Sequence, residues 1–348
     1  ARTVYFSFVN ELINSPQHSY NLLKSRCFCQ NFLCYFQEPK LVSYMTDTIE
    51  NAISIVPSDS CLKNCSAYIT DLIIKSSQTE NKEEIPDIIE PLSNCIANGV
   101  RSNPSVVLDF TNLIELFLNY AEAHKNSIIL DNMLILLIFA SISQSFEINI
   151  SLYKKFSRCI KLIHNDEPSR KVEWQLFSAL SGATADFPVF LIKNPSIIPL
   201  ILTSFSSSSK IIQILSKFTK LCNYSEVNKR ACHDGDLVFI LSQLYISNTV
   251  HYSDYQFEFK ITEEEREKYA YPLIQDISLS YSNSIIDDFY IHNLENPSIF
   301  NLVMRMIAQC ETILTPQFPI GIMPKQFSVR GIYPEDLKEG FSIHLCLN

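Results

Sequence analysis

Glycine is scarce in this chain, and that scarcity limits the folds it can adopt. Only six of the 348 residues are glycine. β-Sandwiches and doubly wound α/β folds need many turns with positive φ, and such turns normally use glycine. Helices joined by short polar loops need far fewer of these turns. The composition therefore favours an all-α fold.

Apolar residues recur at helical spacing in a series of segments separated by short polar or proline-marked joints. The pattern predicts a helix that starts at Ile85 and ends at Asn103-Pro104, because the residue before a proline disfavours helical geometry. Segment 131–143 is apolar nearly all round, so we expect neighbouring helices to bury it. No segment before residue 316 shows clean strand-like alternation. Further helices are expected over residues 4–13, 20–36, 41–55, 60–75, 106–121, 150–163, 168–182, 187–192, 195–205 and 209–222.

The length of the chain favours an elongated arrangement of these helices. A chain of 348 residues with 47% hydrophobic residues exceeds what one compact core usually organises. Successive helix pairs with short joints pack either as a bundle or as a solenoid, and the length favours the solenoid. We therefore expect one helical solenoid over residues 1–315, with segment 251–290 as a surface insertion. In that insertion, Thr262 and Glu265 have the spacing of a capping box.

Residues 211–246 carry the clearest repeat-like pattern. An apolar helix ends at Leu221-Cys222, Asn228 is predicted to open a short helix, and a second apolar helix follows Gly235. We expect Gly235 to adopt the left-handed conformation that lets the next helix turn away. This order resembles the second and third helices of an armadillo repeat. The resemblance implies an armadillo/HEAT-like α-solenoid.

The last 33 residues, 316–348, change character. Apolar and polar residues alternate over residues 341–348, which predicts a half-buried strand. Tyr333-Pro334 followed by Gly340-Phe341 resembles the entry into the concanavalin-A-like sandwich of BEACH-domain (beige/neurobeachin-like) proteins, in a divergent, protist-type form. In that family an armadillo-like region precedes this β-sandwich. The resemblance implies a linker and first sandwich strand over residues 316–348. The missing initiator Met and the strand-like ending suggest a fragment of a longer polypeptide.

Charge and composition disfavour several classes of partner. The net charge of −9 leaves no basic face for nucleic acid, and no Lys/Arg cluster is dense enough for a polybasic membrane anchor. The longest apolar run, 133–140, is far shorter than the roughly 20 residues that span a bilayer. No signal peptide is visible at the start. Eleven scattered cysteines are typical of a reduced, cytoplasmic protein. The family resemblance adds peripheral association with endomembranes through the full-length protein.

The sequence lacks the common catalytic motifs. It contains no glycine cluster that would cradle a phosphate, and no GxSxG, HExxH or EF-hand pattern. We therefore predict no enzyme activity, no cofactor, and no catalytic, cofactor-binding or metal-binding residues.

Two groups of closely spaced cysteines contain potential metal ligands. Cys27, Cys29 and Cys34, with His18, supply zinc-type ligands, but a CxC pair on one helix spreads the sulfurs away from a tetrahedron. The pattern leaves metal binding there open without predicting it. Cys61 and Cys65 lie one helical turn apart and are interpreted as two buried core thiols.

Other reactive-looking residues have simpler interpretations. Cys232-His233-Asp234 contains the residue types of a nucleophile, a base and a carboxylate, but a triad must converge in space and consecutive residues do not. We interpret these three residues as a surface loop. Asp287-Asp288 and the glutamates at 263–265 are interpreted as solvated faces. Trp174 is interpreted as a core anchor rather than a binding hot spot.

The expected function is a non-catalytic protein-interaction scaffold. The resemblance places this scaffold in a large BEACH-type protein of vesicle and membrane trafficking. The partners expected are proteins, with no nucleic acid and no small-molecule substrate. Two alternatives stay open. One is a generic armadillo/HEAT adaptor or regulatory subunit, and the other is the helical domain of an enzyme whose active site lies elsewhere.

Overall fold

The computed structural model is predominantly helical, and 78% of the residues that it describes lie in helices. These described residues also contain one two-stranded sheet. The chain divides into two compact units, residues 1–188 and 189–348. The described residues are 9, 11, 15–25, 39–58, 61–78, 88–143, 146, 148–182, 191–244, 247–252 and 255–280.

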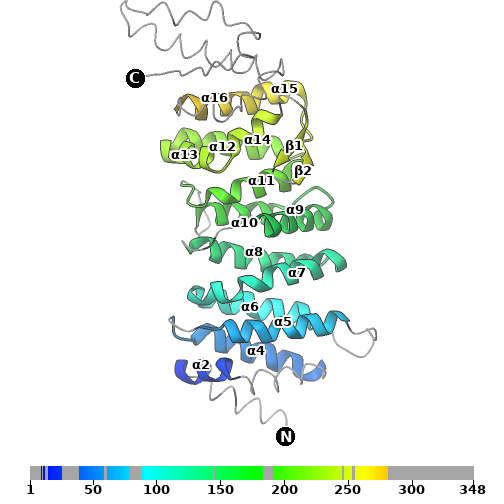
Figure 1. The fold of residues 1–348 in the computed structure, drawn as a ribbon, viewed down its shortest axis with the longest axis vertical. Helices are drawn as coiled ribbons and strands as arrows, with labels where there is room; N and C mark the ends of the chain where they lie inside the picture. The colour runs from blue at the N-terminus through cyan, green and yellow to red at the C-terminus, as the bar shows by residue number, and fades with distance from the viewer. Residues whose placement is uncertain are drawn as a thin grey trace, which may run out of the picture. The chain divides into compact units, whose positions relative to one another are not determined.

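The first unit is built from two layers of helices. Helices α4, α6, α8 and α10 contact one another in succession and form one layer, whereas α5, α7 and α9 form the other (Figure 1). A short helix, α2, contacts α4 and α5. The elements are α2 (Pro16–Lys24), α4 (Pro39–Ile55), α5 (Lys63–Gln78), α6 (Ile89–Ser102), the 3-10 helix η2 (Pro104–Phe110), α7 (Thr111–His124), α8 (Ser127–Ile142), α9 (Ile150–His164) and α10 (Arg170–Ser181).

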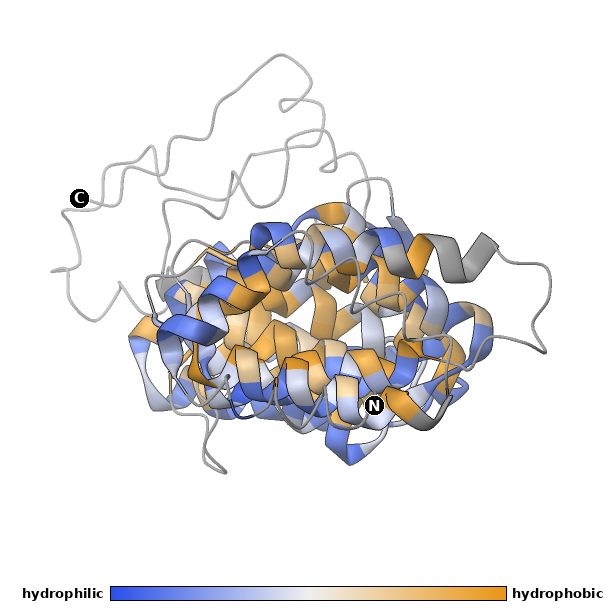
Figure 2. Cartoon of the chain, turned by 90° about the horizontal axis from the view of Figure 1, so that it is seen from below, coloured by the Kyte–Doolittle hydropathy of each residue, from blue (hydrophilic) through white to orange (hydrophobic). Residues whose placement is uncertain are grey.

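Helix α8 is the centre of the first unit. It contacts α6 and α10 in its own layer and α7 in the other. Its apolar residues lie on every side of the helix, and Met133, Leu134 and Leu137 are fully buried. The prediction that segment 131–143 is buried between neighbours is confirmed for most of its residues, whereas Ile142 is 44% exposed. Figure 2 shows the same principle, with hydrophobic residues on the inner sides of the helices and hydrophilic ones outside.

Side-chain caps set where these helices begin. The Oδ1 atom of Asn126 accepts hydrogen bonds from the first amides of α8, while Asn149 and Ser169 cap α9 and α10 in the same way. Left-handed residues end α9 and α10, namely Asn165 and Gly182. The predicted helices over 150–163 and 168–182 therefore exist with boundaries shifted by two residues or fewer at either end.

Three predicted boundaries in this unit and the next need correction. The helix expected from Ile85 is described only from Ile89. The single helix expected over 106–121 is wrong, because a 3-10 helix precedes α7. Asp109 holds that tighter turn in place, since its carboxylate accepts a 2.6 Å hydrogen bond from the amide of Leu62. Of the helix expected over 187–192, residues 191 and 192 are not helical and the rest lie outside the described residues.

The second unit contains shorter helices and the hairpin. Helix α16 contacts α12, α13 and α14, and α14 contacts strand β1. The elements are η3 (Pro195–Ile197), α11 (Ile198–Phe205), α12 (Ile211–Tyr224), α13 (Glu226–Asp234), α14 (Leu237–Gln243), β1 (Thr249–Tyr252), β2 (Tyr255–Glu258), α15 (Glu263–Glu265), the π-helical turn η4 (Arg266–Ala270) and α16 (Tyr271–Ser280).

Residues 211–246 have the predicted order of a helix, a short helix and another helix, but Gly235 acts differently from the prediction. Its φ is −96°, whereas Asp236 takes the left-handed conformation with φ 58°. A Cβ atom at position 235 would lie 2.6 Å from the carbonyl oxygen of Pro195 and 2.6 Å from Cδ1 of Ile198. Glycine is needed here for close packing rather than for positive φ.

Asn228 also differs from its predicted role. Helix α13 opens at Glu226 with Ser225 as its cap, so Asn228 lies inside the first turn. Its buried side chain donates to the carbonyl of Leu221 at 2.8 Å and accepts from the amide of Ile192 at 2.9 Å. Asn228 therefore ties the segment before α11 to the end of α12.

The expectation that no strand precedes residue 316 is wrong. Strands β1 and β2 form an antiparallel hairpin in which Val250 pairs with Phe257. Val250, Phe257 and Phe259 are buried, so the hairpin is anchored by its apolar side chains. After the hairpin, the predicted capping box of Thr262 and Glu265 is confirmed.

Several predictions fall on residues that the structure does not describe. These are the linker and strand over 316–348, the pair Asp287-Asp288, and Cys27, Cys29 and Cys34. Within the described residues, every helix is too short or too polar to cross a bilayer.

Candidate functional site

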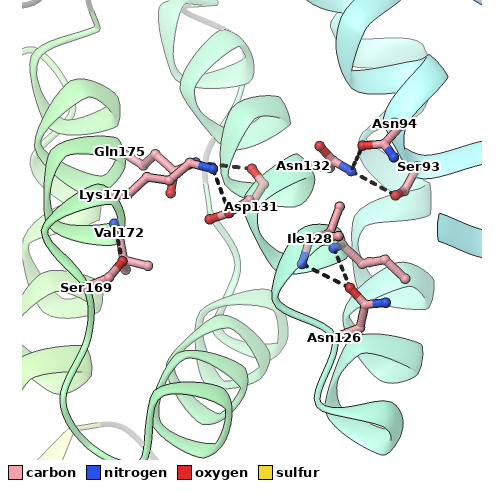
Figure 3. A network of polar contacts seen from close by, with 11 residues as sticks. Ser93, Asn94, Asn126, Ile128, Asp131, Asn132, Ser169, Lys171, Val172 and Gln175 are labelled. Carbon is pink, nitrogen blue, oxygen red and sulfur yellow. Dashed lines mark hydrogen bonds and ion pairs between the residues drawn. The ribbon is translucent and has the colours of Figure 1, made fainter. Parts of the chain in front are cut away.

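Polar side chains connect successive helices of the α4–α6–α8–α10 layer. Between α4 and α6, Asn98 donates from Nδ2 to Oε2 of Glu50 at 3.2 Å. Between α6 and α8, Nδ2 of Asn132 donates to Ser93 Oγ at 3.0 Å and to Asn94 Oδ1 at 2.7 Å (Figure 3). We call the whole set the polar seam: Glu50, Ser93, Asn94, Asn98, Asp131, Asn132, Lys171 and Gln175.

The polar seam continues from α8 to α10 through Asp131. Its Oδ2 atom lies 2.7 Å from Nζ of Lys171, and its main-chain oxygen accepts a 3.3 Å hydrogen bond from Nε2 of Gln175 (Figure 3). The polar seam therefore crosses three successive helix contacts within the first unit.

Helical periodicity explains why these residues line up. Residues three or four apart share one face of a helix, as Asn94 and Asn98 do on α6 and Lys171 and Gln175 do on α10. Asn94 and Asn98 are half-buried and Lys171 is exposed, so the polar seam meets the outer surface of the layer. Two other members of the polar seam, Asn132 and Gln175, lie beneath this surface and are buried, with exposures of 7% and 1%.

The buried amides matter more for packing than the surface ion pair. An exposed pair such as Lys171–Asp131 contributes at most about 1 kcal/mol. A buried amide without partners costs about 1–3 kcal/mol, so the two bonds of Asn132 fix how α8 sits on α6. Gln175 Oε1 is buried and has no hydrogen-bond partner within the described part of the chain.

Two aromatic side chains on helices of this layer are partly exposed. Tyr44 on α4 is 44% exposed. Trp174 on α10, interpreted from the sequence as a core anchor, is half-buried. On α10, positions 171 and 174 face outward, while Leu176 and Phe177 fill the interior. Trp174 therefore presents part of its ring at the outer surface.

The surface-facing groups of the polar seam are side-chain amides and charged groups. Side-chain amides can both donate and accept hydrogen bonds. Among the described residues, no three His, Cys, Asp or Glu side chains are grouped so that they would hold a metal ion. His18, the proposed helper of the N-terminal cysteines, is exposed on α2.

Within the Cys232-His233-Asp234 group, Nδ1 of His233 lies 3.5 Å from Oδ1 of Asp234, whereas Cys232 is buried. The prediction of a surface loop is wrong, because all three lie in the last turn of α13. Cys232 is fully buried with its Sγ atom 3.7 Å from Sγ of Cys222, whereas Asp234 is exposed. The hydrogen bond with Cys222 and the burial raise the pKa of the Cys232 thiol far above its usual range. Such a thiol is a poor nucleophile.

The remaining candidates are mostly surface residues. Cys65 is buried as predicted, but Cys61 is exposed because it precedes the first turn of α5. Glu263 and Glu264 are exposed as predicted, and Glu265 is occupied in the capping box.

The polar seam was missed by the sequence analysis. The available signal was a polar pair, Asp131-Asn132, inside an otherwise apolar helix, together with asparagines at positions 94 and 98. A polar residue at a core position normally has a buried partner. The partner on α6 could not be named because the spacing between helices is not encoded locally.

Comparison with known proteins found no matching family model, no matching curated protein and no matching solved structure.

Proposed function

We propose that this chain is a non-catalytic scaffold that binds proteins, built as an armadillo/HEAT-like α-solenoid. The observation that carries the proposal is the polar seam, which joins four successive helices of one layer and has half-buried or exposed members on each of them, namely Glu50, Asn94, Asn98, Asp131 and Lys171. Stacked helical repeats contact mainly their neighbours and create extended surfaces of this kind.

The outer surface offers both anchors and orienting groups. Tyr44 and Trp174 supply partly exposed aromatic area, which is enriched at the energetic centres of protein interfaces. The half-buried amides of Asn94 and Asn98 supply hydrogen-bonding groups between them. Their positions are held by bonds to neighbouring helices, so little conformational entropy is lost on binding.

Quantitative affinity purification of the full-length protein tests this surface. Tyr44→Ala with Trp174→Ala removes the two anchors. Ile74→Ala with Leu162→Ala is the matched control, because those side chains are 38% and 40% exposed on the other layer. We expect the first double variant to lose partners that the control retains, with unchanged thermal unfolding in both. Equal recovery of every partner by the two double variants would contradict the proposal.

The finer proposal is that the scaffold belongs to a BEACH-type trafficking protein. It is supported by the order of a helical region followed by the Tyr333-Pro334 and Gly340-Phe341 pattern. Sequencing the transcript beyond the codon for Asn348 tests it. A β-sandwich followed by PH-like and BEACH segments is expected. Further helical repeats, or an early stop codon, would leave a generic helical adaptor.

A further inference from the structure

Strand β1 of the hairpin has an outer edge that is closed by side chains. The amide of Thr249 donates to Ser247 Oγ at 3.0 Å, and that hydroxyl donates to the Thr249 carbonyl at 2.9 Å. Two residues on, His251 donates to Oε1 of Gln243 at 2.8 Å and accepts from its Nε2 at 2.9 Å. Both outward-facing residues of β1 thus have their N–H and C=O groups satisfied.

Strand β2 has an outer edge without such caps. The register pairs Thr249 with Glu258 and His251 with Gln256. In an antiparallel ladder, residues opposite one another direct their N–H and C=O groups either both inward or both outward. Because the β1 members of these pairs face outward, Gln256 and Glu258 face outward on β2.

The open part of the β2 edge is short and well defined. Gln256 and Glu258 are exposed, and within the described part of the chain their outward main-chain groups have no hydrogen-bond partner. The next outward amide, that of Lys260, donates to the carbonyl of Ser206 at 2.7 Å. The open edge is therefore bounded on one side, and it presents two amides and two carbonyls at strand spacing.

We propose that the outer edge of β2 binds an extended segment of a protein partner as an added third strand. Unpaired strand edges recruit strands, because main-chain groups at strand spacing are complementary only to another extended chain. This surface lies in the second unit and uses main-chain recognition, so it is independent of the polar seam and its proposed function.

The side chains of β2 define the chemistry of the partner. On one face of the strand, the rings of Tyr255 and Phe257 stack with centroids 5.9 Å apart. On the other face are Gln256 and the carboxylate of Glu258. Cross-strand pairing favours apolar residues beside the rings and a Lys or Arg beside Glu258. The partner is therefore an extended segment of alternating apolar and polar residues with a basic residue. Pairing with a second copy is opposed by the net charge of −9 on each chain.

Proline substitution tests the edge directly. Gln256→Pro with Glu258→Pro removes the two outward amide hydrogens and leaves every ladder hydrogen bond to β1 possible. Gln256→Ala with Glu258→Ala is the matched control, because it removes the side chains but keeps the amides. The probe is a phage-displayed random peptide library panned against the intact chain. Hydrogen exchange and circular dichroism report on the bound edge and on folding.

We expect recovered peptides to show the alternating, basic pattern and to protect the amides of Gln256 and Glu258 from exchange. The alanine variant should retain binding, and the proline variant should bind about tenfold or more weakly, because two hydrogen bonds are lost. If proline disturbs the hairpin, an N-methylated copy of a recovered peptide gives the same test without a protein variant. Peptides that bind the proline variant equally, or that keep their affinity after N-methylation, would overturn the proposal. So would a concentration-dependent dimer in light scattering that the proline variant abolishes.

Discussion

Replacing Gly235 with alanine should destabilise the second unit by steric contact alone. The φ of −96° is allowed for alanine, so no backbone strain is expected. The new Cβ would lie 2.6 Å from a carbonyl oxygen of Pro195 that cannot rotate away, and 2.6 Å from Ile198 Cδ1. Overpacking of this kind costs about 1–3 kcal/mol, and the reduced entropy of the unfolded chain returns about 0.4–1 kcal/mol. The expected net loss is about 1–2 kcal/mol.

Urea unfolding followed by circular dichroism measures this loss, and hydrogen exchange of the α13 and α14 amides locates it. Gly182→Ala is the comparison variant. The φ of Gly182 is 59°, so backbone strain is the expected cause of any destabilisation at that position. Adding Ile198→Val relieves the contact with the new Cβ atom. It should recover part of the stability that Gly235→Ala loses and none of the stability that Gly182→Ala loses. Gly235→Ala with unchanged or increased stability would refute the close approach of α13 to the η3 segment.

Three further predictions concern single groups. Asn132→Ala should lower the free energy of unfolding by about 1–2 kcal/mol, because two acceptors on α6 lose their donor; an unchanged urea midpoint would contradict this. Hydrogen bonds from the Thr262 amide and hydroxyl lower the pKa of Glu265 below its ordinary value. The capping box therefore stabilises the protein above the unfolded-state pKa and loses its effect as pH falls through the folded-state value. A carbon-detected NMR titration should show this low pKa, and Thr262→Ala should raise it towards the ordinary value. Burial and the nearby Glu122 carboxylate raise the pKa of Cys159 to about 12, so iodoacetamide at neutral pH should label exposed Cys61 before Cys159. Equal labelling rates of Cys61 and Cys159 in the native state would count against the buried position of Cys159.

Local patterns predicted several helices of the first unit, among them those expected over 150–163 and 168–182. Periodic apolar residues identify a helix wherever one face packs on a neighbour, as in α9, and continuous apolar residues identify α8 as buried on all sides. Caps such as Asn149 and Ser169 are equally local, because a side chain bonds an amide three residues away.

The role of Gly235 could not be predicted, because it depends on a carbonyl forty residues earlier in the chain. The sequence indicates that a position near a helix end requires glycine. It does not say whether the cause is a positive φ or a close approach of another segment, because both require glycine. The structure distinguishes these causes by placing the left-handed conformation on Asp236, a residue type that tolerates it.

The hairpin was missed because its strands are only four residues long. The segment Tyr255 to Phe259 does alternate, but five residues carry too weak a signal to separate a strand from a loop rich in tyrosine and acid.

The polar seam and the β2 edge were both missed for one physical reason. Each is a set of polar groups whose partners are determined by tertiary packing, whereas the sequence shows only the groups themselves. On the polar seam, Asn132 is satisfied by α6, so its burial costs little and it orders the layer. On the hairpin, Gln243 and Ser247 satisfy β1 while β2 keeps its outward groups. Because the side chains of Gln243 and Ser247 cap the edge of β1, another strand can be added only at the edge of β2. That asymmetry is why the β2 edge, and not the hairpin as a whole, is the surface to test for an extended partner.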